Sequence, residues 1–234
     1  MEIEALFISD VHLGTKYTKA TELLEILKYY KPKKLFLIGD IIDGWALKKK
    51  HYWNQEQTNV IRKILSYSKN GTEIYYISGN HDDFLKHYIF DFGNIHIISE
   101  MIWNNCLITH GDKYDTVVMN NKWIAHLGSI GYDIALYLNK YISNIRKLFG
   151  LDKKSFSKWL KNNVKEAINF IYKFEEILIT DTIKKGCDTV ICGHVHTPDD
   201  KIINNVRYLN TGDWIENCSY IIYDKNKFTL KYYD

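Results

Sequence analysis

Five short polar clusters, each placed directly after an apolar run, constrain the fold of this chain more than any other feature. The runs before them are short and rich in β-branched or aromatic residues, as is typical of strands covered on both faces. Side chains that follow strands meet at the carboxyl edge of an α/β sheet, where such sheets bind ligands. We therefore expect one site built from Asp10-Val-His12, Gly39-Asp40-Ile-Ile-Asp43, Gly79-Asn80-His81-Asp82, His110-Gly111-Asp112 and Gly193-His194-Val-His196.

The remaining pattern predicts a layered α/β fold with mixed sheets. Apolar residues at helical spacing predict helices at 20–30 and 53–69. Alternating residues over 201–209 and 219–233, with a turn at 224–227, predict antiparallel strands. Further strands are expected at 3–9, 34–38, 73–78, 95–99, 102–109 and 189–192.

The whole chain, residues 1–234, is expected to form one domain with a helical insertion at 113–186. No linker rich in Gly, Ser or Pro divides the chain, which contains only two prolines. Within the insertion, apolar residues recur at helical spacing over two stretches. Because this is more helix than a connection between two strands needs, we interpret 113–186 as a cap beside the site.

The insertion also carries the basic surplus of the chain. Residues 113–186 hold thirteen Lys and Arg against seven Asp and Glu, whereas the whole chain has a net charge of +3. Such a surplus suggests an anionic partner. No apolar run reaches the roughly 18–20 residues of a membrane-spanning helix. We therefore expect a cytoplasmic protein whose contact with a membrane is peripheral.

A site that uses all five clusters is a two-metal centre, in which ions about 3.5–4 Å apart clamp a phosphate ester for in-line attack. Two divalent ions outweigh the negative charge of Asp10, Asp40 and a bridging hydroxide, and the remaining positive charge polarises the phosphate. Asp40 can bridge because its carboxylate has two oxygens. Asn80 adds a neutral oxygen. The imidazoles favour Mn, Fe, Co or Zn over Ca or Mg, with Mn the expected ion; they are His12, His110, His194 and His196.

His81 differs from these imidazoles. It directly follows Asn80, so its ring cannot easily reach the same ion, and we interpret it as a cation or a general acid near the leaving-group oxygen. The ligand imidazoles need hydrogen-bond partners for their other ring nitrogens. Asp82 and Asp112 are placed to be two of these partners, although Asp82 is equally placed to orient His81.

This set of motifs resembles the calcineurin-like metallophosphoesterase superfamily over residues 1–213. The resemblance implies a four-layer α/β/β/α sandwich with the helical cap inserted, and it makes His81 the catalytic histidine. It assigns one metal to Asp10, His12, Asp40 and His196, and the other to Asp40, Asn80, His110 and His194.

The cap and the tail resemble, more narrowly, the UDP-2,3-diacylglucosamine pyrophosphatase group at 139–146, 161–165, 170–175 and 210–216. The resemblance implies hydrolysis of UDP-2,3-diacylglucosamine to lipid X and UMP, in lipid A synthesis at the cytoplasmic face of the inner membrane. The best-known branch of that group has Arg where this chain has His81. The chain looks like the sister branch that keeps G-N-H-D.

A diphosphate substrate with two acyl chains needs a metal clamp and an apolar slot. A cap with an apolar stripe beside basic side chains suits both, and a peripheral contact with an anionic membrane as well. The expected partner is thus a UDP-linked or other phosphodiester lipid, not a nucleic acid. The candidate substrate contacts are Asn80, Asp115, Arg146, Lys154, Lys158, Lys161 and Lys165.

Other classes of function stay open. Another phosphoesterase of this superfamily, such as a nucleotide pyrophosphatase, a cyclic-nucleotide phosphodiesterase or a phosphoprotein phosphatase, needs no long apolar cap. A non-enzymatic interaction module would be expected to have lost ligands or His81. A nuclease is disfavoured because the basic segment is interleaved with aliphatic faces rather than with aromatic residues suited to base stacking.

Overall fold

The computed structural model describes residues 1–88, 91, 93–115 and 153–234, and of residues 86, 88 and 153–167 it describes the backbone alone. The chain divides into two compact units, Met1–Asp112 with Ile179–Asp234, and Lys113–Leu178. The first unit contains all five polar clusters. Much of the segment interpreted as a cap lies outside the described residues, so that interpretation stays a prediction.

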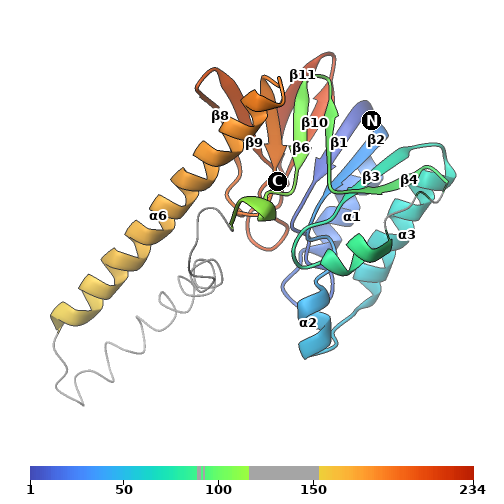
Figure 1. The fold of residues 1–234 in the computed structure, drawn as a ribbon. Coiled ribbons are helices and arrows are strands. Elements are labelled where there is room, and N and C mark those ends of the chain that lie inside the picture. The colour runs from blue at the N-terminus through green and yellow to red at the C-terminus, as the bar shows by residue number, and fades with distance from the viewer. Residues whose placement is uncertain (89–90, 92, 116–152) are drawn as a thin grey trace. The chain divides into compact units, whose positions relative to one another are not determined.

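A six-stranded mixed sheet forms one half of the first unit (Figure 1). Its first four strands run parallel, and the two C-terminal strands continue the sheet antiparallel. In spatial order the strands are β11 (Lys227–Tyr232), β10 (Ser219–Asp224), β1 (Glu2–Ile8), β2 (Lys31–Ile38), β3 (Glu73–Ile77) and β4 (Ile95–Ile98).

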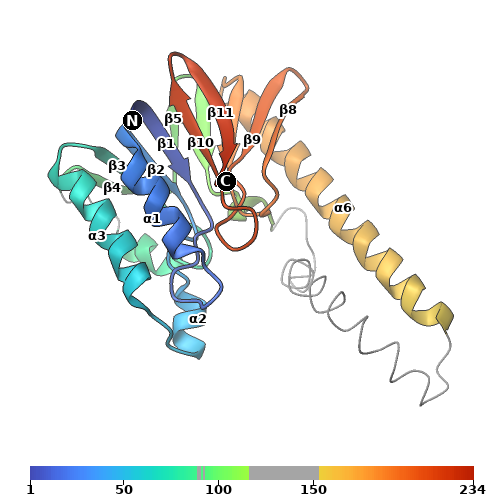
Figure 2. The ribbon, with the colours of Figure 1, turned by 180° about the vertical axis from the view of Figure 1, so that it is seen from behind.

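Two helices, α1 (Ala20–Tyr29) and α3 (Gln55–Lys69), cover the outer face of this sheet (Figures 1 and 2). Successive residues of a strand point to opposite faces. On β2, Leu35 and Leu37 accordingly join the core beneath the helices, while Phe36 and Ile38 join the core on the other face. This is why the strand reads as a continuous apolar run. Two short helices, α2 (Gly44–Lys49) and the 3₁₀ helix η1 (Asp83–Tyr88), follow β2 and β3.

A five-stranded mixed sheet packs on the inner face of the first. Between the sheets, Phe7 stacks on Phe36 with ring centroids 4.6 Å apart, and Trp103 packs against both rings. In spatial order the strands are β5 (Glu100–Trp103), β6 (Cys106–Thr109), β7 (Thr189–Cys192), β9 (Val206–Asn210) and β8 (Asp199–Ile203).

The prediction of one continuous strand over 102–109 was wrong. β5 and β6 form an antiparallel hairpin, and Asn104 and Asn105 make its turn with φ angles of 49° and 58°. Two-residue hairpin turns require this left-handed backbone, and Asn tolerates it better than most residues. Asn204 and Asn205 make the same kind of turn between β8 and β9.

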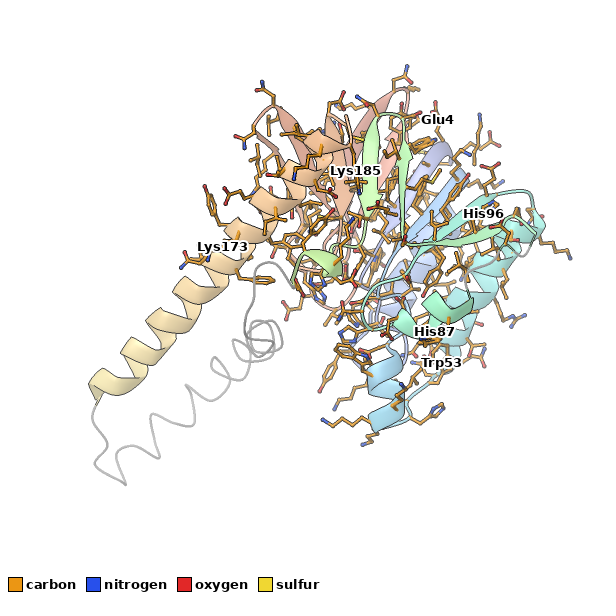
Figure 3. The ribbon with its side chains drawn as sticks, viewed as in Figure 1. Glu4, Trp53, His87, His96, Lys173 and Lys185 are labelled. Atoms are coloured by element: carbon orange, nitrogen blue, oxygen red, sulfur yellow. The ribbon has the colours of Figure 1, made fainter. Side chains whose placement is uncertain are left out.

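The last turns of α6 (Lys153–Lys184) belong to the first unit and lie against the outer face of the five-stranded sheet (Figures 1 and 2). Ile179 and Thr182 are buried there. Lys185, labelled in Figure 3, donates a hydrogen bond of 2.6 Å to Glu100 on β5. The order of layers is therefore helix, sheet, sheet, helix, and the predicted α/β fold with two mixed sheets is confirmed. The 3₁₀ helix η2 (Asp112–Tyr114) follows β6.

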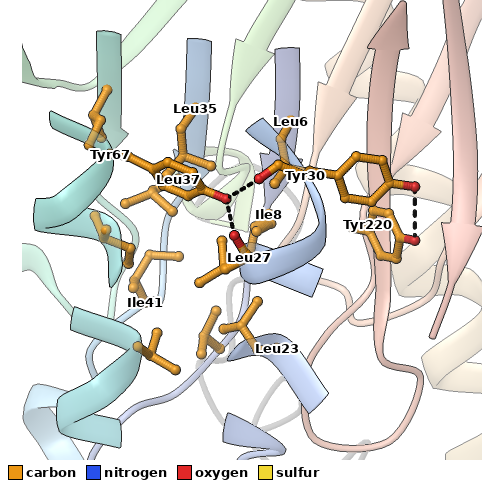
Figure 4. Close-up of a cluster of buried hydrophobic side chains, with 14 of the residues drawn as sticks. Leu6, Ile8, Leu23, Leu27, Tyr30, Leu35, Leu37, Ile41, Tyr67 and Tyr220 are labelled. Atoms are coloured by element: carbon orange, nitrogen blue, oxygen red, sulfur yellow. Dashed lines mark hydrogen bonds between the residues drawn. The ribbon is translucent and has the colours of Figure 1, made fainter. Parts of the chain in front are cut away.

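A tyrosine on α3 forms hydrogen bonds with backbone carbonyls at the C-terminal end of α1 (Figure 4). The hydroxyl of Tyr67 donates to the backbone carbonyl of Leu27, and it lies 2.8 Å from the carbonyl oxygen of Tyr30. Carbonyls in the last turn of a helix have no partner within the helix. Burial raises the pKa of Tyr67, so the phenol stays protonated and able to donate.

We expect Tyr67→Phe to lower the free energy of unfolding by about 1–2 kcal/mol, because it leaves buried carbonyls without a donor. Urea denaturation measures this change. The matched control is Tyr233→Phe, which removes an exposed hydrogen bond of 2.7 Å to Glu25 and should change stability by less than about 0.5 kcal/mol. Equal effects of the two substitutions would contradict the role given to Tyr67.

Candidate metal centre

The five polar clusters follow the carboxyl ends of β1, β2, β3, β6 and β7. Within them, three groups of three donors each have their ligand atoms within 4.8 Å of one another, and two of these groups share no residue; the third, His12, Asp43 and His81, shares His12 with one of them. The first donor group is Asp10, His12 and His196, and the second is Asp40, His110 and His194. The structure thus brings together, from both sheets, residues that lie far apart in the sequence.

Five of these donors have a left-handed backbone. The φ angle lies between 49° and 70° at Asp10, His12, Asp40, His194 and His196. For a residue other than glycine this conformation costs on the order of 1 kcal/mol, and it persists only where the surrounding structure enforces it. Backbone hydrogen bonds do so here: the amides of Asp10 and His12 donate to the carbonyls of Gly39 and Asp40, at 3.0 and 2.9 Å.

In the first donor group, two imidazoles and a carboxylate converge. His196 Nε2 lies 3.1 Å from Asp10 Oδ1 and 3.3 Å from His12 Nε2. The other ring nitrogens face carboxylates, with His12 Nδ1 3.1 Å from Asp43 Oδ2 and His196 Nδ1 3.5 Å from Asp213 Oδ2. When the Nδ1 atoms carry the protons, the Nε2 lone pairs point at one another and at Asp10. A cation removes that repulsion, and a metal ion fits this donor set.

The electrostatics of the first group also favour added positive charge. Burial alone lowers the pKa of His196, but the carboxylates of Asp10 and Asp213 outweigh it and raise that pKa to about 10. Burial raises the pKa of Asp10, yet the neighbouring imidazoles of His196 and His110 hold it below its ordinary value. A buried charge is stable only when it is paired. This pocket therefore binds either a proton or a metal ion.

In the second donor group, a backbone carbonyl orients one imidazole toward a carboxylate. His110 Nδ1 donates to the carbonyl of Ile38 at 2.8 Å, which leaves Nε2 facing Asp40 Oδ2 at 3.3 Å. Burial raises the pKa of Asp40, but the imidazoles of His110 and His12, one from each donor group, hold it well below its ordinary value. Asn80 Oδ1 is buried and accepts no hydrogen bond from the described residues. Its oxygen is thus left for a cation.

Two glycines are required because ligand side chains pack directly on them. A Cβ atom at Gly39 would lie 2.3 Å from the ring of His110, and one at Gly193 would lie 2.3 Å from Asp10 Oδ2. Both distances are far below van der Waals contact. Any side chain at Gly39 or Gly193 would displace a donor.

Asp82 and Asp112, predicted as partners of imidazoles, differ in what they contact. Asp82 accepts hydrogen bonds from the amides of Gly79 and Ile41, at 2.6 and 3.0 Å, and from the hydroxyl of Tyr76 at 2.7 Å. Its described hydrogen bonds thus join the loops after β2 and β3. Burial lowers the pKa of His110, but the nearby carboxylates of Asp40 and Asp10 raise it well above its ordinary value. Asp112 adds a smaller effect in the same direction.

Two carboxylates that the sequence analysis left without a role orient the imidazoles instead. Asp43 faces His12 through Oδ2 and His81 through Oδ1, each at 3.1 Å, and it also caps α2 by accepting the amide of Ala46. Asp213 faces His196 and is fixed by backbone amides of residues 215–217. Asp43 stands in a named cluster and Asp213 in the N-T-G-D-W segment, so proximity to those motifs was the available signal.

His81 lies beside the first donor group and forms a further group of close donors with His12 and Asp43. Its ring packs edge-on against His12, with centroids 4.8 Å apart, and against Trp45 at 4.3 Å. Burial lowers the pKa of His81, but the carboxylate of Asp43, which faces Nδ1 as an acceptor, and the charge of Asp40 raise it above its ordinary value. A protonated, oriented imidazole is what a general acid requires.

Most of the predicted substrate contacts cannot be placed. Arg146 lies outside the described residues, as do the side chains of Lys154, Lys158, Lys161 and Lys165. Asp115 belongs to the second unit and directly follows η2. Asn80 belongs to the first unit and directly precedes His81, whose amide donates to Asp40 Oδ1 at 2.8 Å.

Comparison with known proteins adds independent evidence. The sequence profile described as calcineurin-like phosphoesterase matches residues 3–198. The UDP-2,3-diacylglucosamine hydrolase of Wigglesworthia glossinidia brevipalpis is 25% identical over 98% of this chain and 94% of its own length. The hydrolase of that name from Porphyromonas gingivalis is 24% identical over 99% of this chain and 98% of its own. Yfce, a phosphoesterase from E. coli, shares the fold, with a TM-score of 0.51, 12% identity and coverage of 98% and 93%.

We expect Asp40→Asn and His81→Ala to fail in different ways. A neutral amide cannot serve two cations, so Asp40→Asn should weaken the binding of both metal ions. His81→Ala should retain the metal content of the unsubstituted protein and lower turnover by about 10²–10⁴-fold, as for a lost proton-transfer group. Elemental analysis of purified protein, with turnover of a chromogenic phosphodiester, measures both. Equal metal loss in the two variants would contradict the assignment of His81.

Proposed function

The chain belongs to the calcineurin-like phosphoesterase family and is a metal-dependent hydrolase, and from this premise we propose that it hydrolyses UDP-2,3-diacylglucosamine to lipid X and UMP in lipid A synthesis. The observation that carries the proposal is similarity along nearly the whole chain to relatives named for that hydrolysis. The two adjacent donor groups support it, because hydrolysis of a diphosphate requires charge stabilisation on both sides of the attacked phosphorus.

We assign two divalent cations to the centre, with manganese as the expected ion. Asp10, His12, Asp40 and His196 would hold one ion, and Asp40, Asn80, His110 and His194 the other. The mixture of imidazole nitrogen and carboxylate oxygen suits manganese, iron, cobalt or zinc. When bound, the ions act as Lewis acids on the phosphate and lower the pKa of a coordinated water.

The protein's own residues perform the remaining steps. Asp43 holds His81 through Nδ1, at 3.1 Å, and so fixes the direction of its ring. In its protonated form His81 donates a proton to the oxygen of the departing phosphate, while Asn80 contributes a neutral oxygen that does not reduce the positive charge of the centre. Asp43 also faces His12, so one carboxylate orients both a metal ligand and the proton donor.

A phosphoesterase with a smaller substrate is the alternative reading of the same centre. The donor set and His81 would serve any phosphodiester, and the residues predicted to hold acyl chains lie outside the described part of the chain. Within the described residues, no helix is both long enough and apolar enough to span a membrane. The two proposed functions differ in whether the substrate carries long acyl chains, and this difference can be tested with substrates.

We expect the manganese-loaded protein to hydrolyse UDP-2,3-diacylglucosamine with a kcat/KM at least about 100-fold above that for UDP-N-acetylglucosamine, because long buried acyl chains supply binding energy that the acetylated sugar lacks. The rate of UMP release, with the products identified by phosphorus NMR, measures this ratio. Chelation should abolish both activities, and added manganese should restore them.

The control is bis-p-nitrophenyl phosphate, which tests the metal centre without a sugar or a lipid. His81→Ala should lose turnover of all three substrates. A folded, metal-loaded protein that cleaves UDP-2,3-diacylglucosamine and UDP-N-acetylglucosamine equally well would rule out the lipid substrate and favour the alternative.

A further inference from the structure

Two loops beside the metal centre pack together into one surface. The first, residues 13–19, follows β1 and the ligand His12; the second, residues 44–54, follows β2 and contains α2. Leu13 pairs with Ile42, and a Cβ atom at Gly14 would lie 2.7 Å from Leu47. α2 lies at the end of the first unit where β1 and β2 finish (Figure 1). The two loops therefore form a continuous surface at the edge that carries the donors.

A buried glutamine fixes the first loop to α3. Gln57 is fully buried; its Oε1 accepts the amide of Gly14 at 3.0 Å, and its Nε2 donates to the carbonyl of Thr15 at 2.7 Å. α3 is itself continuous with the second loop through its cap, Asn54. The surface is thus held in place by the core rather than by contacts among its exposed side chains.

This surface has one sign of charge. The two loops contain five lysines and neither aspartate nor glutamate. Their formal charge of five positive units is larger than the net charge of +3 of the whole chain. All five lysine residues are exposed: Lys16, Lys19, Lys48, Lys49 and Lys50. Exposed charges of one sign, with no acid in the same two loops, attract an extended anion.

Exposed aromatic residues lie among these lysines. Tyr17 is 63% exposed, Trp45 45% and Tyr52 39%. Lys16 Nζ lies 5.1 Å from the centre of the Tyr17 ring. Tyrosine and tryptophan combine an apolar body with a polar tip and are enriched at the interface between lipid and water, where lysines contact the headgroups.

We propose that this basic aromatic surface, residues 13–19 and 44–54, docks the protein on an anionic lipid surface with the metal centre beside the contact. The proposal extends the proposed function, since a diacylated substrate resides in a membrane. A lipid surface fits better than a nucleic acid, because strand binding uses a groove lined by a stacking platform, whereas these aromatic residues stand on two loops and a short helix.

Sedimentation with lipid vesicles tests the surface without any substrate. Wild-type protein should bind vesicles containing about one third phosphatidylglycerol far better than neutral phosphatidylcholine vesicles, and this binding should fall as salt rises. The triple substitution Lys48→Glu, Lys49→Glu and Lys50→Glu should weaken binding at least about tenfold. The neutral triple, each of these lysines to Gln, should weaken it less. Tyr17→Ser with Tyr52→Ser should reduce the binding that remains at high salt.

The matched control reverses the same number of charges on the hairpin of β10 and β11: Lys225→Glu, Lys227→Glu and Lys231→Glu. It should leave vesicle binding within about twofold of wild type, since these residues lie outside the two loops. Turnover of bis-p-nitrophenyl phosphate in solution should be unchanged in both triple variants, which shows that the fold and the metal centre are intact.

Three results would overturn the proposal. In the first, wild-type protein does not sediment with anionic vesicles at low salt. In the second, the control triple loses as much vesicle binding as the loop triple. In the third, vesicle binding is lost only in a variant with Lys158→Glu, Lys161→Glu and Lys165→Glu. Tighter binding to single-stranded DNA than to vesicles, lost in the same loop triple, would instead assign the surface to nucleic acid. Vesicle binding without hydrolysis of UDP-2,3-diacylglucosamine would leave the surface standing and reject the proposed function.

Discussion

The carboxylate of Asp10 is the point on which the structure around the site depends. It is fully buried, and a buried charge must be paired or hydrogen-bonded to be tolerated. Its Oδ2 accepts from the hydroxyl of Ser9 and, at 3.0 Å, from the amide of His194, while its Oδ1 faces His196. Its backbone bonds to Gly39 and Trp214. One residue thereby joins β1 to the ends of β2 and β7 and to the segment after β9.

A buried polar network extends from that carboxylate between the two sheets. The hydroxyls of Ser9 and Thr211 lie within hydrogen-bond distance of each other, and Thr211 also donates to the carbonyl of Cys192 at 3.1 Å. Ser219 on β10 donates to the carbonyl of Thr211 at 2.6 Å. Apolar packing holds the sheets face to face, but the hydrophobic effect is non-directional. These directional bonds fix the register in which donors from both sheets meet.

The sequence predicts those parts of the fold that local pattern determines. Apolar runs followed by Asp, His and Gly mark strand ends, because a strand covered on both faces admits polar residues only where it stops. The hairpin turn at Asn104 and Asn105 escaped prediction, since two polar residues within a longer apolar run carry a weaker signal than Gly or Pro. Asp43 and Asp213 escaped for a different reason. Their roles depend on which imidazole lies opposite, and that is set by packing of segments far apart in the chain.

The left-handed backbone at five donors has a thermodynamic consequence. Those conformations, the clustered carboxylates and the opposed imidazole lone pairs all raise the free energy of the folded chain when no cation is present. A ligand that binds only the native state lowers its free energy by an amount that grows with the logarithm of ligand concentration. Metal occupancy and folding are therefore linked equilibria, and the availability of metal in the cell sets the fraction of chains that is both native and competent.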